Sequence, residues 1–205
     1  MAVEPGARAS ALLWALAERA PDSISFGAIA AALEDRGFGI AILCLALPNA
    51  LPGPYIPGLS AVLGLPIVWL GWQLALGRDH PQLPSWLQRR SLSRGRFVGF
   101  VARVVPLLTR LERWLVPRQG WLTQAPGQRV PGLALVFYGL VMMLPVPFGN
   151  LPVGFAIAVL ALGLIEQDNR ALGWGLALGA AACLWTAALV AIGIAAAGRL
   201  LPYFK

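Results

Sequence analysis

Four ionisable side chains lie at the edges of apolar segments, where they could bind ions or an anionic lipid. Glu166 and Asp168 close one apolar segment, and carboxylates in that position can bind protons or cations. Arg36 and Arg129 begin two similar segments, and a guanidinium can hold a lipid phosphate. Ordinary alternatives exist for both pairs. The acids could form a solvated helix end with Arg170 as their partner, and the arginines could be positive-inside anchors.

The two similar segments form a repeat that contains two breaks. Clusters of Pro, Gly and Asn interrupt apolar sequence at residues 48–57 and 145–152. When Arg36–Tyr55 is aligned with Arg129–Phe148, at an offset of 93, 7 of the 20 positions are identical. A matched pair of interrupted apolar segments in the two halves of a membrane protein is typical of a binding site.

The residues of the breaks complete the candidate substrate-binding set. At membrane depth every backbone group needs a partner, so an irregular loop is tolerated only inside protein or beside water. Asn49 and Asn150 would satisfy loose backbone groups or touch a polar ligand, and Pro52, Pro54 and Pro147 would line the path of that ligand. The alternative is a pair of ordinary turns at the far face of the membrane.

The lengths of the apolar runs favour the sheltered location. Runs of 14 or 15 residues precede each break, and a helix of that length covers about 22 Å of a hydrocarbon core that is about 30 Å thick. They reach the far face only if the bilayer thins or the turn hides in the bundle. We therefore expect breaks that are buried or line a cavity.

Composition points to a membrane protein rather than a soluble enzyme. The 205 residues are 58% hydrophobic and 12% charged, with a mean hydropathy of +0.71, whereas soluble domains are about 25% charged. The chain has one His, and it lacks a phosphate-binding glycine loop and a zinc-binding helix. Cys44 and Cys183 lie inside apolar runs and are read as small core residues. We expect no enzymatic activity, no cofactor and no metal.

The net charge of +7 is concentrated in the middle of the chain. Ten arginines lie between Arg78 and Arg129. A basic stripe can bind nucleic acid, but this one lies between apolar hairpins and favours cytoplasmic placement. We expect membrane lipids as partners, including an anionic lipid or a lipid-linked saccharide, and no nucleic acid. Homo-oligomerisation is left open.

The pattern along the chain predicts one all-α, polytopic integral membrane domain. Its predicted helices include Ala9–Arg19 and Ile24–Glu34, with N-cap oxygens from Asp22, Ser23 and Ser25, and a basic amphipathic, interfacial helix over Phe97–Val116. Both hairpins begin beside a charged cluster, which favours the same orientation for the two, whereas an inverted pair would require Phe97–Val116 to span the membrane. We also leave open whether the hairpins are re-entrant or fully crossing. The parts are N-terminal amphipathic helices in 1–35, a first broken hairpin in 36–77, a basic loop and interfacial helix in 78–130, a second broken hairpin in 131–168, and a transmembrane helix in 171–198.

Several motifs resemble the ExoD family of bacterial membrane proteins. They are Glu34–Gly39, Ala46–Asn49, Pro57–Ser60, Pro145–Pro152 and Leu162–Asp168. The resemblance covers about residues 24–188 and implies a multi-pass protein of the bacterial inner membrane, linked to exopolysaccharide synthesis and to tolerance of alkaline conditions. In one departure, the acidic motif ends in Asp168-Asn169, where we expect Asp-Gly in the family. The following turn would then be looser or capped by Asn169.

Three functions are compatible with these observations. The first is a small transporter or flippase-like carrier of a lipid-linked saccharide or phospholipid, whose headgroup Arg36 and Arg129 would hold. The second is a proton or cation transporter in which Glu166 and Asp168 titrate. The third is a non-transporting adaptor for a polysaccharide synthase. In each case the basic central loop would be cytoplasmic.

Overall fold

The computed structural model describes residues 9–25, 36–50, 58–78, 80–82, 91–112, 117–146 and 148–200. Pro52, Pro54 and Pro147 of the predicted site lie outside these residues, as do residues 26–34 of a predicted helix. The fold is predominantly helical, as composition predicted. The elements in chain order are α1 (Ala9–Glu18), β1 (Ser23–Ser25), α3 (Gly37–Ala50), α4 (Leu59–Ala75), β2 (Ser91–Ser93), α6 (Arg94–Glu112), the 3₁₀ helix η2 (Trp121–Thr123), α7 (Arg129–Met142), α8 (Asn150–Glu166) and α9 (Asn169–Leu200).

Two short strands correct the prediction that a helix begins at Ile24. Strand β1 pairs antiparallel with β2, so Ile24 lies opposite Leu92. Ile24 is buried between the exposed Ser23 and the half-buried Ser25, which is the two-residue period of a strand. The predicted helix start at Ile24 is therefore wrong, as is the N-cap role of Ser23, whereas a role of Ser25 at a later helix start would involve residues outside the described ones. The pairing partner is distant in sequence, so local capping signals could not reveal it.

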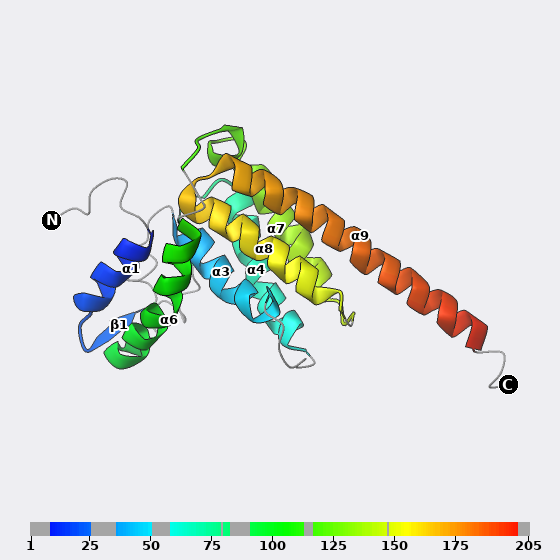
Figure 1. The fold of residues 1–205 in the computed structure, drawn as a ribbon, viewed down its shortest axis with the longest axis horizontal. Coiled ribbons are helices and arrows are strands. Elements are labelled where there is room, and N and C mark those ends of the chain that lie inside the picture. Colours follow the sequence, from blue (N-terminus) through cyan, green and yellow to red (C-terminus); the bar gives the residue numbers. More distant parts are fainter. Residues whose placement is uncertain are drawn as a thin grey trace.

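The predicted basic helix forms, and it packs against the N-terminal helix. Helix α6 begins at Arg94, slightly before the predicted start. Phe97 and Val101, one turn apart, are both buried, and α6 contacts α1. Arg110 is exposed. Figure 1 shows α1 and α6 to one side of the other helices, at the end where α3 begins. The interfacial location of α6 stays a prediction.

The core consists of α3, α4, α7 and α8, and each of its most extensive helix pairs combines one helix from each repeat. The most extensive contacts pair α3 with α8 and α4 with α7. Gly39 lies against Ala161 and Ile165, while Gly154 lies against Asn49, so α3 and α8 are antiparallel. The first helix of each repeat thus packs on the second helix of the other, which is a pseudo-two-fold arrangement. Helices α3 and α7 run in the same direction (Figure 1), as predicted for repeats of equal orientation.

Glycines allow the backbones of α4 and α7 to approach closely. Gly64 and Gly71 on α4 face Gly139 and Gly132 on α7, and each pair is spaced by seven residues. A Cβ on Gly71 would lie 2.9 Å from the backbone nitrogen of Val136 and 3.0 Å from the carbonyl oxygen of Gly132. Small residues at such seams are characteristic of helix packing in membranes, where the hydrophobic effect does not drive helices together.

The helices of the two repeats have matching lengths. Helices α3 and α7 have 14 residues each, and α4 and α8 have 17 each, or about 21 and 25 Å. Helix α8 begins at Asn150, which corrects the prediction that the second break extends to Pro152. Pro152 lies in the first turn, where its missing N–H removes no intrahelical hydrogen bond.

Helix α9 is the one helix among the described residues that is long and apolar enough to cross a membrane. Its candidate span is Asn169–Ala196, with a mean hydropathy of 2.1, and only 17% of an 18-residue stretch within it is buried inside the protein. The apolar helix predicted over residues 171–198 therefore forms, and its crossing of a membrane stays a prediction. Gly175 packs on Leu160 of α8, and Gly179 packs on Tyr138 of α7. Figure 1 shows the C-terminal part of α9 continuing well past the core.

The outer surface of the core and of α9 carries many exposed apolar side chains. Soluble monomers seldom expose contiguous apolar patches larger than a few hundred Å². These residues lie on four helices, and tryptophans are frequent among them. The exposed large apolar residues are Val62, Leu65, Trp69 and Trp72 on α4, Leu133, Phe137 and Leu140 on α7, Leu151 and Phe155 on α8, and Trp174, Leu178, Leu184, Trp185, Val190, Ile192 and Ile194 on α9.

Candidate functional site

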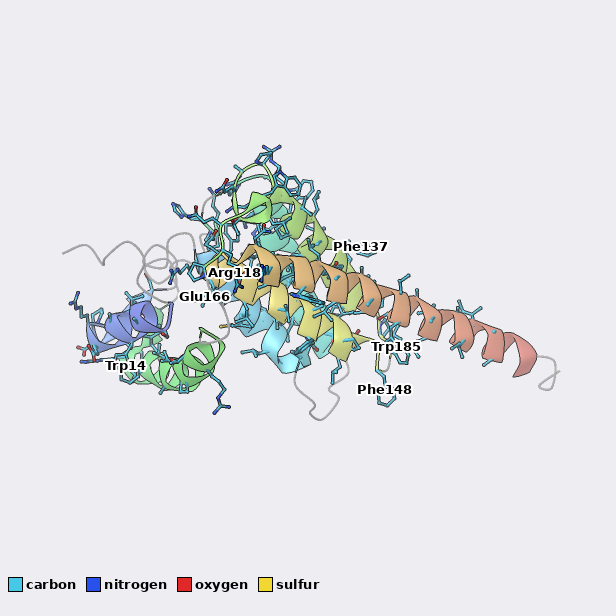
Figure 2. All side chains as sticks on the ribbon, turned by 45° about the horizontal axis from the view of Figure 1, so that its top comes forward. Trp14, Arg118, Phe137, Phe148, Glu166 and Trp185 are labelled. Carbon is cyan, nitrogen blue, oxygen red and sulfur yellow. The ribbon has the colours of Figure 1, made fainter. Side chains whose placement is uncertain are left out.

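The predicted site residues separate into two groups at opposite ends of the core. Arg36 immediately precedes α3, Arg129 is the first residue of α7, and Glu166 is the last residue of α8; we call this the charged end. Asn49 and Asn150, together with Ser60, lie at the other end, which we call the break end. The two ends are about 21–25 Å apart along the helices. Figure 2 shows Glu166 and Arg118 at the charged end and Phe148 and Trp185 toward the other.

Asp168 is a structural residue that caps α9. It is 2% exposed, and its Oδ1 accepts hydrogen bonds from the backbone N–H groups of Arg170 (2.9 Å) and Ala171 (3.4 Å). Its Oδ2 pairs with the guanidinium of Arg118 at 3.4 Å. The predicted partner, the Arg170 side chain, is therefore wrong, as is the predicted solvated location. A carboxylate at a helix N-terminus satisfies free N–H groups and favours the helix dipole.

Asn169 anchors the loop that precedes α7 rather than capping the helix. Its backbone N–H donates to the carbonyl oxygen of Arg118 at 3.0 Å, and its Oδ1 accepts from the N–H of Leu122 at 2.9 Å. Gly120 packs directly on the Asn169 side chain. The residue that departs from the expected Asp-Gly motif therefore fixes residues 118–123 beside the ends of α8 and α9.

Glu166 is buried, contrary to the solvated alternative. Its side chain is 5% exposed at the C-terminal end of α8. The equivalent residue of the first repeat is Gln73, 93 positions earlier, which is 3% exposed. The Gln73 amide accepts a hydrogen bond from the Gln82 N–H at 2.6 Å and donates to the Gln82 carbonyl at 3.1 Å. In the first repeat this position therefore fixes the backbone of Gln82, in the segment that follows α4, whereas in the second repeat it carries a carboxyl group.

The break end contains a buried polar cluster centred on Ser60. The hydroxyl of Ser60 lies 2.8 Å from Oδ1 of Asn49 and, with the Asn150 amide oriented to satisfy its neighbours, 2.9 Å from Oδ1 of Asn150. In that orientation the Asn150 nitrogen donates to the carbonyl oxygens of Met142 and Leu144, both at 3.3 Å. Asn150 therefore satisfies loose carbonyls at the end of α7, one of its two predicted roles.

Ser60 cannot serve both asparagines as a donor, because a hydroxyl group has one hydrogen. Nδ2 of Asn49 is buried and has no hydrogen-bond partner within the described part of the chain. A buried donor without a partner costs about 1–3 kcal/mol. Ser60 belongs to the Pro57–Ser60 motif, but its role could not be predicted because its partners come from α3 and α8.

The second break has an apolar tip. Phe148 is 85% exposed and adopts a positive φ of 62°, a conformation that is uncommon for a bulky side chain. The following Gly149 lies against Thr186 of α9. The Thr186 hydroxyl shares its one hydrogen between the carbonyl oxygens of Ala182 at 2.9 Å and Gly149 at 3.3 Å. These contacts fix the level of the break along α9.

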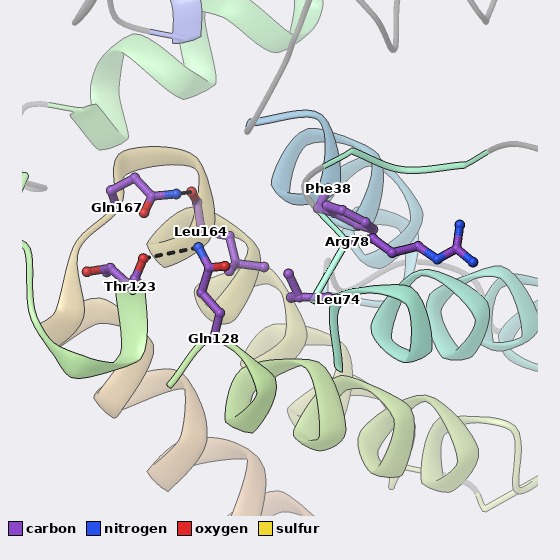
Figure 3. A pocket seen from close by; sticks show the side chains of 7 residues that line it. All are labelled: Phe38, Leu74, Arg78, Thr123, Gln128, Leu164 and Gln167. Carbon is purple, nitrogen blue, oxygen red and sulfur yellow. Dashed lines mark hydrogen bonds between the residues drawn. The ribbon is translucent and has the colours of Figure 1, made fainter. Parts of the chain in front are cut away.

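A cavity of about 170 Å³ opens at the charged end, where both repeats contribute (Figure 3). Leu74 and Gln167 line it from equivalent positions, 93 residues apart. The Gln128 amide donates to the Thr123 carbonyl at 3.0 Å, and the Gln167 amide donates to the Leu164 carbonyl at 3.1 Å. Sequence reasoning missed this cavity, since its walls are helix ends that meet only in the fold. The lining residues are Phe38, Leu74, Arg78, Thr123, Gln128, Leu164 and Gln167.

Comparisons with known proteins identify the family. The family model described as "Exopolysaccharide synthesis, ExoD" matches residues 9–188. The protein named "Uncharacterized protein slr1875" from Synechocystis sp. is 31% identical over 160 residues, covering 78% of this chain and 74% of that protein. "Protein ExoD" from Rhizobium meliloti is 31% identical over 147 residues, covering 70% of this chain and 60% of that protein. No solved structure matches the chain significantly. The chain therefore belongs to the ExoD family, whose members are membrane-associated and linked to exopolysaccharide synthesis.

Proposed function

We propose that this chain is a multi-pass protein of the bacterial inner membrane that carries an anionic lipid, such as a lipid-linked saccharide, across the bilayer during exopolysaccharide production. The family name supplies the pathway, and the outward apolar side chains of α4, α7, α8 and α9 support immersion of the core in lipid. The observation that carries the proposal is the position of the break end beside an uncharged stretch of α9.

That position is measured along α9. Thr186, which contacts the second break, lies 17 residues after Asn169, or about 25 Å from the charged end. Helix α9 then remains uncharged through Gly198, about another 18 Å. A hydrocarbon core about 30 Å thick that starts at the charged end would extend about 5 Å beyond the break. Residues 190–196 are all exposed, which supports lipid surrounding α9 past the break.

The chemistry of the breaks supports the same depth. A turn in water favours polar side chains at its tip, whereas Leu144, Phe148 and Leu151 are exposed around the second break. Behind this apolar surface, Asn150 of the polar cluster donates to two carbonyl oxygens at the end of α7 that would otherwise lack partners in lipid. A lipid carrier requires such a sheltered polar path beside an apolar surface.

A reconstitution assay tests the proposal. Purified protein in proteoliposomes is expected to move a fluorescently labelled anionic phospholipid between leaflets faster than empty vesicles do. Arg36→Gln and Arg129→Gln should slow this movement, because each removes a charge at the charged end. Arg110→Gln removes an equal charge from exposed α6 and is the matched control. If the vesicles move neither lipid nor protons, both transport functions are refuted and the adaptor function remains.

The burial of Glu166 favours a second candidate function, proton-coupled transport. A buried carboxyl group at the end of a membrane helix is a common proton-binding element, and Asp168 is occupied by the α9 cap and by Arg118. If protons are carried, a pH-sensitive dye inside the same vesicles should report a flux that Glu166→Gln abolishes. Arg36→Gln should leave that flux intact. The reverse pattern supports the lipid carrier.

A further inference from the structure

The cavity at the charged end has the hydrogen-bonding capacity of a site for hydroxyl groups. Gln128 and Gln167 each use one N–H for a backbone carbonyl, so each retains a second N–H and an acceptor oxygen. The Thr123 hydroxyl donates to Gly120 and accepts from its N–H, which leaves one lone pair. The wall therefore offers both hydrogen-bond donors and hydrogen-bond acceptors. A sugar hydroxyl is both donor and acceptor, whereas a phosphate group at neutral pH mainly accepts.

The inside of the cavity offers no charged partner to a ligand. No carboxylate or lysine lines it among the described residues, and Phe38, Leu74 and Leu164 contribute apolar side chains to the lining. Arg78 is the one cationic residue of the described wall. Figure 3 shows its side chain running away from Thr123, Gln128 and Gln167, and it is exposed. Its guanidinium group thus lies at the rim, where it could meet an anion outside the cavity.

The volume suits one six-membered ring. An apolar protein cavity of about 150 Å³ holds one benzene molecule, and this cavity has about 170 Å³. A lining that combines apolar side chains with amide and hydroxyl groups matches a pyranose, which presents C–H groups on its faces and hydroxyl groups around its edge. A longer oligosaccharide does not fit inside.

We propose that the cavity binds the sugar ring of a glycosyl phosphate, with the amides of Gln128 and Gln167 on the hydroxyl groups and Arg78 at the rim on the phosphate. The proposal rests on the carrier function above, since it names the headgroup that the carried lipid would present. Binding is nevertheless measurable without translocation. The shared chemistry can come from a lipid-linked saccharide or from a soluble sugar phosphate, so both are tested.

The experiment measures binding of glucose 1-phosphate, glucose and inorganic phosphate to purified protein in detergent by saturation-transfer NMR. A second arm uses nanodiscs that contain a polyprenyl phosphate hexose. Glucose 1-phosphate should bind more tightly than either fragment. Tighter binding of the lipid than of soluble glucose 1-phosphate would identify the lipid as the source, and equal affinities would identify the soluble sugar phosphate.

Matched variants assign the contacts. Gln128→Met and Gln167→Met keep side-chain length but remove the hydrogen bonds, and each should weaken binding of both sugars about three- to tenfold. Gln124→Met changes an exposed glutamine of the same loop and should have no effect. Arg78→Gln should weaken glucose 1-phosphate and leave glucose unchanged. Unchanged circular dichroism and melting temperature show that each variant is folded.

Two outcomes would overturn the proposal. If inorganic phosphate binds as tightly as glucose 1-phosphate and responds only to Arg78→Gln, the rim is an anion site and the cavity does not bind sugar. If the two Gln→Met variants bind both sugars normally, the sugar lies elsewhere. Sugar binding with no lipid translocation would refute the carrier function and retain the cavity assignment. Lipid translocation that the cavity variants leave unchanged would support the carrier function and refute the cavity assignment.

Discussion

Gly71→Ala tests the close packing of α4 against α7, on which the pseudo-two-fold core depends. The added Cβ would lie 2.9 Å from both the Cβ of Leu135 and the backbone nitrogen of Val136. Ordinary contact begins at 3.4 Å, so the helices must part by about 0.5 Å. Two of the three nearest atoms belong to backbone, including the Gly132 carbonyl oxygen at 3.0 Å. These atoms cannot turn aside as the end of a flexible side chain can.

The matched control is Gly193→Ala on α9, where an added Cβ meets nothing within 4 Å. Both substitutions gain helix propensity, about 1 kcal/mol in water, and this gain cancels when the two variants are compared. The remaining difference is the overpacking cost, about 1–3 kcal/mol. The parting of α4 from α7 also loosens Gly132 against Ala75 at the charged end, so Gly71→Ala should be the less stable of the two variants.

The assay is reversible unfolding in mixed detergent micelles titrated with SDS, followed by far-ultraviolet circular dichroism. Gly71→Ala should unfold at a lower SDS fraction than Gly193→Ala, with a difference of about 1–3 kcal/mol in the free energy of unfolding. Equal midpoints for the two variants would refute the close packing at Gly71, because they would mean that α4 and α7 do not approach closely in the folded protein.

Three further substitutions test individual contacts. Asp168→Ala should destabilise the protein by about 0.5–2 kcal/mol through loss of the α9 cap, while Arg118→Gln should cost well under that, because its partly exposed guanidinium makes a weak ion pair; equal losses in the same SDS titration would contradict this ranking. Ser60→Ala should cost about 1–3 kcal/mol, since it leaves one buried asparagine oxygen without its donor; an unchanged midpoint would show that the cluster is open to water. Gln73→Leu should speed hydrogen exchange of the Gln82 amide about fivefold or more, and unchanged exchange would refute that hydrogen bond.

The helical part of the fold was largely predictable from sequence, because it follows local patterns. Apolar runs ended by Pro, Gly or charge predicted α3, α4, α7 and α9 to within a few residues, and the charged cluster at the start of each repeat favoured two units of the same orientation. The boundary of α8 was missed because Asn150 and Pro152 suit a turn equally well. The strand at Ile24 was missed because its partner lies far away in the chain.

The site was predictable only in part, because most of its groups meet through tertiary packing. The repeat pointed correctly to Asn150 as a partner for loose backbone groups, and burial now distinguishes Glu166 from a solvated helix end. Asp168 looked like a titratable site but is tied to backbone N–H groups. Ser60 and Gln167 belong to motifs of the family resemblance, but their roles could not be predicted, since their neighbours come from other helices.

The depth of the second break is the most direct test of the account. A nitroxide spin label at Phe148→Cys, in protein whose two native cysteines are replaced by alanine, reports its collisions with oxygen, which concentrates in lipid, and with a water-soluble nickel chelate. Labels at Ile192→Cys on α9 and at Arg110→Cys on α6 provide the comparison. The proposed arrangement predicts high oxygen and low nickel collision rates at positions 148 and 192, and the reverse at position 110. Nickel collisions at position 148 as frequent as those at position 110 would place the break in water and contradict the sheltered path on which the carrier function depends.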